Sequence, residues 1–170
     1  MNELLVMRHA KSDWSAGVSD FDRPLNDRGR RAADQMAAWL LDHELCPDRV
    51  VSSPAARTRA TALAVVTECD IDRRRLEFET DGYLADAFTW RQLLAKQQPG
   101  RILICGHNPG LDDLVDELSG RRAPMSVSGK LMTTAAIAHF RVNSHWDQLR
   151  EDTSELVQLV RPRELADGTT

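Results

Sequence analysis

The chain has 170 residues, which suits a single domain with a buried core. Apolar residues make up 42% and charged residues 28%, and the formal net charge of -4 is unlike the basic balance of nucleic-acid-binding proteins. No apolar run approaches the roughly 20 residues of a membrane span. The N-terminal "MNELLVM" lacks the basic region and long apolar segment of a signal peptide. We therefore expect a cytoplasmic protein that binds neither nucleic acid nor membranes.

Strand-like and helix-like segments alternate along the chain. In chain order, the pattern predicts a strand (3–7), a helix (26–43), a strand (48–53), a helix (54–68), a short strand (76–79), a helix (88–97), a strand (101–106), a helix (111–120) and two strands (135–142 and 155–160). This alternation is typical of a mostly parallel central sheet flanked by helices, a three-layer α/β sandwich. We expect one domain over 1–160 and a flexible C-terminal tail over 161–170.

Three of the predicted helices carry signals at their ends. Asn26 is a candidate N-cap of the first helix. Ser53 is a candidate N-cap of the second helix, with Pro54 at the first helical position. Gly120 is expected to stop the helix that begins near 111.

The three cysteines, Cys46, Cys69 and Cys105, are far apart in the sequence and form no CxxC spacing. This spacing does not indicate a metal site or a redox motif. We therefore expect three buried, reduced thiols, as in a cytosolic protein.

Arginine or histidine follows three of the predicted strands. Arg8 and His9 come directly after the first strand, Arg57 lies one helical turn past the second, and His107 stands just after the strand at 101–106. In α/β sheets, ligands bind beyond the carboxyl ends of the strands. Arginine offers a planar fork of donors that matches phosphate oxygens, and the helix that follows Ser53 adds backbone N–H groups. These residues therefore predict a cage for a dianionic phosphoryl group.

The segments "RHAKS", "DFDRPLNDRG", "SSPAARTRATA" and "GHNPGL" together resemble the histidine phosphatase superfamily, which has the phosphoglycerate-mutase-like fold. They are similar to its small-chain branch, the SixA-type phosphohistidine phosphatases, over about residues 4–142. The resemblance implies that His9 is the nucleophile, that Arg8 and Arg57 bind phosphate, and that His107 also contacts it. It implies no metal and no organic cofactor, and the sequence has no metal-ligand spacing.

The chemistry of phosphoryl transfer suits these residue types. A neutral imidazole nitrogen of His9 can attack phosphorus in line and form a phosphohistidine intermediate. A carbonyl group that accepts the other ring N–H would fix the tautomer. Arg8, Arg57 and His107 would then neutralise the non-bridging oxygens.

The sequence departs from the wider superfamily in two places. Many members have an asparagine seven residues after the arginine of the motif, and here that position is Ser15, a candidate phosphate contact. Members that act on phosphate esters carry an acidic residue before the late histidine, but Glu79, Asp81 and Asp86 stand in no clear motif. An alkoxide leaving group needs a proton, whereas imidazole can already carry its own. The weak acid signal therefore favours phosphohistidine as the substrate.

Other residues of these motifs have a supporting interpretation. Asp20, Arg23, Pro24 and Asn26 belong to the "DFDRPLN" segment. We interpret them as supports of the loop behind Arg8 and as the cap of the first helix, not as catalytic. Trp14 is a candidate pocket wall.

The leading hypothesis is a monomeric phosphatase that acts on a phosphohistidine displayed by another protein. The short separation between Arg57 and His107 leaves little chain for a lid over a small metabolite, so we expect an open site. One alternative keeps His9 as nucleophile and changes the substrate to a small phosphate ester, such as a sugar phosphate or nucleotide. Another is a phosphate-binding module without turnover.

Overall fold

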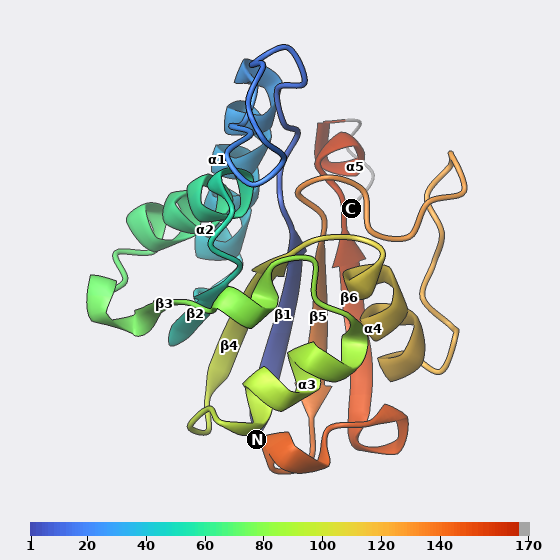
Figure 1. Cartoon of the computed structure of the whole chain (residues 1–170). Coiled ribbons are helices and arrows are strands. Elements are labelled where there is room, and N and C mark those ends of the chain that lie inside the picture. The colour runs from blue at the N-terminus through green and yellow to red at the C-terminus, as the bar shows by residue number, and fades with distance from the viewer. Residues whose placement is uncertain (167–170) are drawn as a thin grey trace.

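The computed structural model describes residues 1–166, which form a six-stranded sheet between two layers of helices (Figure 1). The strands are β1 (Asn2–Arg8), β2 (Arg49–Ser52), β3 (Leu76–Phe78), β4 (Arg101–Gly106), β5 (Ile137–Val142) and β6 (Ser154–Val160), in the order β3-β2-β4-β1-β5-β6. The pairs among β3, β2, β4 and β1 are parallel, whereas β5 runs antiparallel to both of its neighbours. The predicted mostly parallel sheet is confirmed.

The helices cover both faces of the sheet. They are α1 (Asp27–Asp42), α2 (Ala56–Glu68), α3 (Ala87–Ala95), α4 (Gly110–Leu118) and α5 (Pro162–Ala166), with 3₁₀ turns at Arg73–Arg75, Thr80–Gly82, Trp146–Gln148 and Glu151–Thr153. Helices α1 and α2 pack together on one face, and α3 and α4 lie on the other (Figure 1).

Strand β1 is buried on both sides, which explains its continuous apolar run. Leu4 and Val6 pack into the core beneath α3 and α4. Leu5 and Met7 face the opposite core, beneath α1 and α2. Because successive side chains of a strand point to opposite faces, a central strand needs apolar residues at every position. The strand that leads to Arg8 and His9 is thereby held rigidly.

The predicted helix ends are confirmed at two places and wrong at one. The side chain of Asn26 accepts a hydrogen bond from the Gly29 N–H and caps α1. Gly120 follows the last residues of α4 with a positive φ of 59°, as a helix stop requires. Ser53 does not cap α2, because its backbone N–H donates to the Cys105 carbonyl and extends the sheet by one residue. Helix α2 therefore begins only at Ala56, without a side-chain cap.

The expectation of three reduced thiols is wrong for two of the cysteines. Cys46, after α1, and Cys69, at the end of α2, form a disulfide, and only Cys105 is a buried free thiol among residues 1–166. The two positions are 23 residues apart in the sequence, but the fold brings their Cα atoms to 5.6 Å. Within the same residues, no helix combines the length and the apolar character that a bilayer crossing requires.

The start of the predicted flexible tail contacts the rest of the domain. Arg161 is buried, and its guanidinium donates to the carbonyl groups of Leu131 and Pro124. Helix α5 follows it and lies beside α1, where the side chain of Gln35 reaches the Pro162 carbonyl. The flexibility of the tail over 161–166 stays a prediction, and the remainder of that prediction, 167–170, lies outside the described residues.

Candidate active site

The four predicted cage residues converge at the carboxyl ends of β1, β2 and β4. Arg8 ends β1 and is in register with Gly106 at the end of β4, so that His9 and His107 follow neighbouring strands. The centroids of the two imidazole rings are 5.4 Å apart. Arg57 lies in the first turn of α2 and contacts His107. The sheet register thus brings together residues from three distant parts of the sequence.

His9 is held as a neutral imidazole with one nitrogen available for attack. Its backbone N–H donates to the Gly106 carbonyl, and its own carbonyl accepts from Ala135. Nδ1 lies 2.7 Å from the Ala10 carbonyl oxygen, to which it donates its proton, so Nε2 is the unprotonated nitrogen. Burial lowers the pKa of His9 to about 3, and the charges of Arg8 and Arg57 act in the same direction. The nucleophile therefore needs no deprotonation at neutral pH.

Both ring nitrogens of His107 have protein partners. Nδ1 accepts from Nη2 of Arg57 at 3.2 Å, and Nε2 lies 2.7 Å from the hydroxyl oxygen of Ser53. Because Nδ1 accepts, the neutral ring carries its proton on Nε2 and donates it to Ser53. Burial and the Arg57 charge lower the pKa of His107 to about 4. Ser53, which the sequence suggested only as a helix cap, is thus part of the site.

Two buried guanidinium groups keep unused donors. Nη1 of Arg8 donates to the Met132 carbonyl at 3.0 Å. The Nε atoms of Arg8 and Arg57 are buried without a hydrogen-bond partner among residues 1–166. A buried charged donor without a partner costs free energy unless a ligand satisfies it. The charges of Arg8 and Arg57 act on the neutral imidazole of His9, and two such guanidinium groups suit an anionic ligand with several acceptor oxygens.

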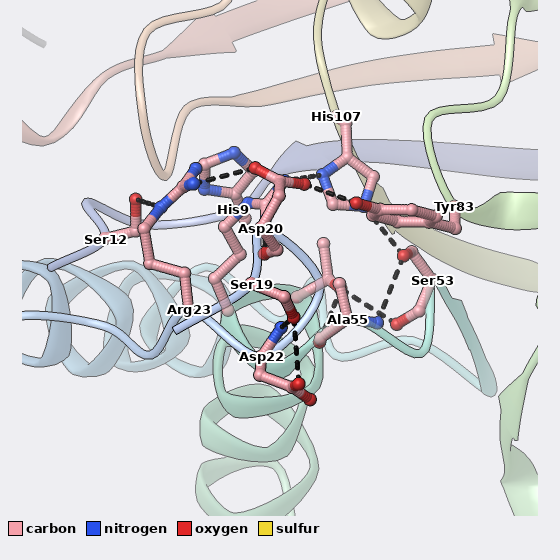
Figure 2. Close-up of polar contacts among 12 residues, drawn as sticks. His9, Ser12, Ser19, Asp20, Asp22, Arg23, Ser53, Ala55, Tyr83 and His107 are labelled. Carbon is pink, nitrogen blue, oxygen red and sulfur yellow. Dashed lines mark hydrogen bonds and ion pairs between the residues drawn. The ribbon is translucent and has the colours of Figure 1, made fainter. Parts of the chain in front are cut away.

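Asp20 connects the site to the loop that precedes α1. Its carbonyl accepts from Nη1 of Arg57 at 2.6 Å, and its Oδ2 accepts from Nη2 of the same guanidinium at 3.1 Å. Oδ1 accepts from Arg23 at 2.7 Å, and the hydroxyl of Tyr83 also donates to the carboxylate (Figure 2). The Tyr83 hydrogen bond, with those from Arg23 and Arg57, holds the pKa of Asp20 far below its usual range. The carboxylate is therefore ionised.

The interpretation of Asp20 and Arg23 as mere loop supports was incomplete. Both side chains belong to the hydrogen-bonded cluster around Arg57. The ring of Tyr83 packs edge-on against His107, with centroids 5.4 Å apart, and was not predicted at all. The spacing of three residues between Asp20 and Arg23 is a signal in the sequence for the ion pair between them. The contacts of Asp20 with Arg57 and Tyr83 leave no such signal, because these residues are remote in sequence.

The loop at 12–23 is fixed by close contact with α1. The Asn26 N–H donates to the Lys11 carbonyl, and a Cβ on Gly29 would lie 2.0 Å from that same oxygen. Ser12 forms an isolated antiparallel bridge with Leu25. The "RPLNDRG" segment thus requires glycine where the first turn of α1 approaches the loop backbone.

Ser15 and Trp14 lie at the exposed edge of this loop. The hydroxyl of Ser15 donates to Asp13 at 2.6 Å, and the residue is exposed. The geometry does not bring Ser15 into the cage, and its phosphate contact stays a prediction. Trp14 is 80% exposed and stacks on the guanidinium of Arg23, with Cζ 3.7 Å from the ring centroid.

The three candidate acids lie apart from the cluster. Asp86 caps α3, since its carboxylate accepts from the Thr89 N–H at 2.8 Å. Asp81 is exposed in a 3₁₀ turn, and Glu79 precedes that turn. Among residues 1–166, no hydrogen bond or ion pair joins these three side chains to the cage, and no group of three or more histidine, cysteine or acidic side chains is arranged to hold a metal ion.

Comparisons with known proteins show which proteins the chain is similar to. Residues 4–86 match the model of the histidine phosphatase superfamily (branch 1). An uncharacterized protein of Mycobacterium tuberculosis is 32% identical over 165 residues, which cover 92% of this chain and all of that protein. A SixA phosphohistidine phosphatase homolog of Haemophilus influenzae is 27% identical over 72% of this chain and 80% of its own. A solved structure from Agrobacterium tumefaciens assigned to SixA superposes with a TM-score of 0.77 at 27% identity, over 95% of this chain and 98% of that one.

Proposed function

Because the chain belongs to the histidine phosphatase superfamily and is of the SixA type, we propose that it hydrolyses protein phosphohistidine through a phospho-His9 intermediate. In the first step, the Nε2 lone pair of His9 attacks phosphorus, and the bond between phosphorus and the substrate nitrogen breaks. In the second step, water attacks phosphorus and the electron pair returns to Nε2. The products are free histidine on the partner protein and inorganic phosphate.

The site offers complementary charge to the phosphoryl group. The guanidinium groups of Arg8 and Arg57 would supply hydrogen bonds for its non-bridging oxygens. His107 is neutral before binding, and a bound dianion would raise its pKa, because an opposite charge favours the protonated ring. A protonated His107 would add positive charge beside Arg57, and it would have to exchange its hydrogen bond with Ser53 or Arg57 for one with the phosphoryl oxygens.

The three side-chain donors around the Asp20 carboxylate are the observation that favours phosphohistidine over a phosphate ester. Asp20 is the one carboxylate among residues 1–166 with a hydrogen bond to a predicted cage residue, and its low pKa leaves it without a proton to donate. An alkoxide would have to leave unaided from such a site, whereas imidazole leaves as a neutral molecule. Among residues 1–166, Glu79, Asp81 and Asp86 form no hydrogen bond or ion pair with the cage residues, which supports a site without a general acid.

Turnover measured side by side on a phosphohistidine protein and a panel of esters tests this proposal. We expect rapid hydrolysis of phosphohistidine, slower hydrolysis of aryl phosphates and almost none of sugar phosphates. The proposal fails if a sugar phosphate or nucleotide is the better substrate, in which case the small-ester alternative holds. Absence of turnover on every compound would indicate the binding module.

The predicted cytoplasmic location and monomeric state have separate tests. A disulfide between Cys46 and Cys69 is unusual in a reducing compartment. Alkylation of thiols in unbroken cells, followed by peptide mapping, would show whether the bond exists there, and light scattering would report the mass of the purified protein.

A further inference from the structure

Asp20 is placed between the buried cage and the solvent. Its side chain is 46% exposed, whereas that of Arg57, with which it pairs, is only 3% exposed. Figure 2 shows its carboxylate between Arg23 on one side and Tyr83 on the other. Because Arg57 also contacts His107, the carboxylate borders the position where a phosphoryl group would meet the cage. We therefore expect a group attached to that phosphorus to lie close to Asp20.

The charge of Asp20 limits what it can do there. It keeps its negative charge at neutral pH, so it can accept a hydrogen bond but has no proton to give. Asp20 already forms hydrogen bonds with three side chains, and a carboxylate has about four acceptor positions on its two oxygens. The exposed part of the group can therefore accept one more donor.

The leaving group of phosphohistidine offers such a donor. One nitrogen of the ring carries the phosphoryl group, and the other can carry a proton. When the bond from phosphorus to the first nitrogen breaks, its electron pair stays on that nitrogen, and the proton on the other nitrogen keeps the departing imidazole neutral. A carboxylate next to that N–H stabilises the protonated ring, because an opposite charge at close range raises the pKa of imidazole by about 1–3 units.

We propose that Asp20 is a further catalytic residue, whose carboxylate accepts a hydrogen bond from the second ring nitrogen of the substrate histidine and so keeps the leaving imidazole protonated. The proposal rests on the function proposed above. It also adds selectivity, since the leaving oxygen of an ester gains negative charge and is repelled by the same carboxylate. A purely positioning role, through Arg57 and Arg23, would instead affect all phosphoryl substrates alike.

The test compares two substrates in three proteins. kcat/KM is measured for a phosphohistidine protein and for an aryl phosphate, with wild type, Asp20→Asn and Asp22→Asn. Asp22 is the matched control, because it lies in the same loop and its exposed carboxylate contacts only Ser19 among the described side chains. In Asp20→Asn, we expect the ratio of phosphohistidine to aryl phosphate activity to fall at least about tenfold, as one pKa unit implies. Asp22→Asn should keep the wild-type ratio.

A pH profile separates direct contact from positioning. In wild type, phosphohistidine turnover should persist to higher pH than in Asp20→Asn, because the carboxylate keeps the substrate ring protonated. The aryl phosphate profile should show no such difference. Asp20→Glu, which keeps the charge, should recover part of the selectivity and the wild-type profile, and it serves as the second variant if Asp20→Asn folds poorly.

The outcomes distinguish this inference from the proposed function. Equal losses on both substrates, with unchanged pH profiles, would overturn the role of Asp20 and leave the phosphohistidine assignment intact. A wild-type enzyme that ignores phosphohistidine and hydrolyses esters would overturn the proposed function first.

Discussion

The floor of the site and the loop at 12–23 are built in different ways. His9, Arg57 and His107 are 7%, 3% and 2% exposed, and strand register or the first turn of a helix fixes them. Trp14 and Val18 in the loop are 80% and 53% exposed, and the loop is held by hydrogen bonds from its own turn and by those that Asp20 and Phe21 form with residues of other elements. A rigid floor suits chemistry that needs exact aim, and an exposed loop suits contact with what the substrate is attached to. Asp20 joins the two regions.

Among substitutions in the floor and in the loop, we expect the largest loss of activity at the nucleophile, His9. His9→Ala should lower kcat/KM by at least about 10⁴-fold, as loss of a nucleophile does in other covalent enzymes. Wild type, quenched during turnover, should carry acid-labile phosphate on His9. Circular dichroism of His9→Ala and His9→Asn checks that the fold is retained. Substantial activity in either folded variant would exclude the covalent route.

A substitution of Arg57 tests whether the geometry of its guanidinium group or only its positive charge is needed for activity. Arg57→Lys keeps the positive charge but loses the fork that reaches Asp20 and His107 together. We expect kcat/KM to fall by about 10²–10³-fold, the usual cost of a lost donor at a developing charge. Steady-state kinetics on any accepted substrate measures it. A loss below about tenfold would show that Arg57 contributes only a general field, and Arg59→Lys on the same helix is the control.

The buried histidines of the floor should make the fold sensitive to acid. The pKa values of His9 and His107 lie at about 3 and about 4 in the fold, below the ordinary 6.5. Above pH 6.5, both rings are neutral in the folded and the unfolded chain, so their titration does not change the free energy of unfolding. As the pH falls from 6.5 toward 4, the unfolded chain binds protons that the folded chain excludes, and stability decreases. At pH 5, each histidine should cost about 2 kcal/mol.

Urea denaturation at pH 7 and pH 5 measures this effect. His9→Ala should lose less stability between the two values than wild type does. An equal loss in both proteins would mean that His9 titrates normally in the fold.

Substitutions in the loop at 12–23 should have the smallest effect on activity. Trp14→Ala removes a stacking partner from Arg23 at an exposed position, where such a contact is worth about 0.5–1 kcal/mol. We expect aryl phosphate turnover to fall by no more than about fivefold. A loss of turnover as large as that of Arg57→Lys would mean that Trp14 acts as a cage residue. The floor and the loop would then not differ in their effect on activity.

The sequence predicts the sheet and the four cage residues because their signals are local. An apolar run that ends in Arg8 and His9 identifies both a central strand and the residues at its end, and the same logic applies to His107. The roles of Ser53, Tyr83 and Asp20 could not be predicted, because each depends on a partner from another element. The Cys46–Cys69 bond is of the same kind, since only the packing of α1 against α2 brings the two thiols together.

The disulfide closes a ring that contains one whole strand and the whole helix that follows it. The covalent ring from Cys46 to Cys69 contains β2, Ser53, Arg57 and the whole of α2. A closed loop of this length lowers the chain entropy of the unfolded state, which corresponds to about 3 kcal/mol of stability. Of the cage residues, only Arg57 lies within the ring, while Arg8, His9 and His107 lie outside it. Reduction of this disulfide should therefore lower the fraction of enzyme that is folded. The segment that it releases is the one that contains Arg57, the phosphate-binding arginine.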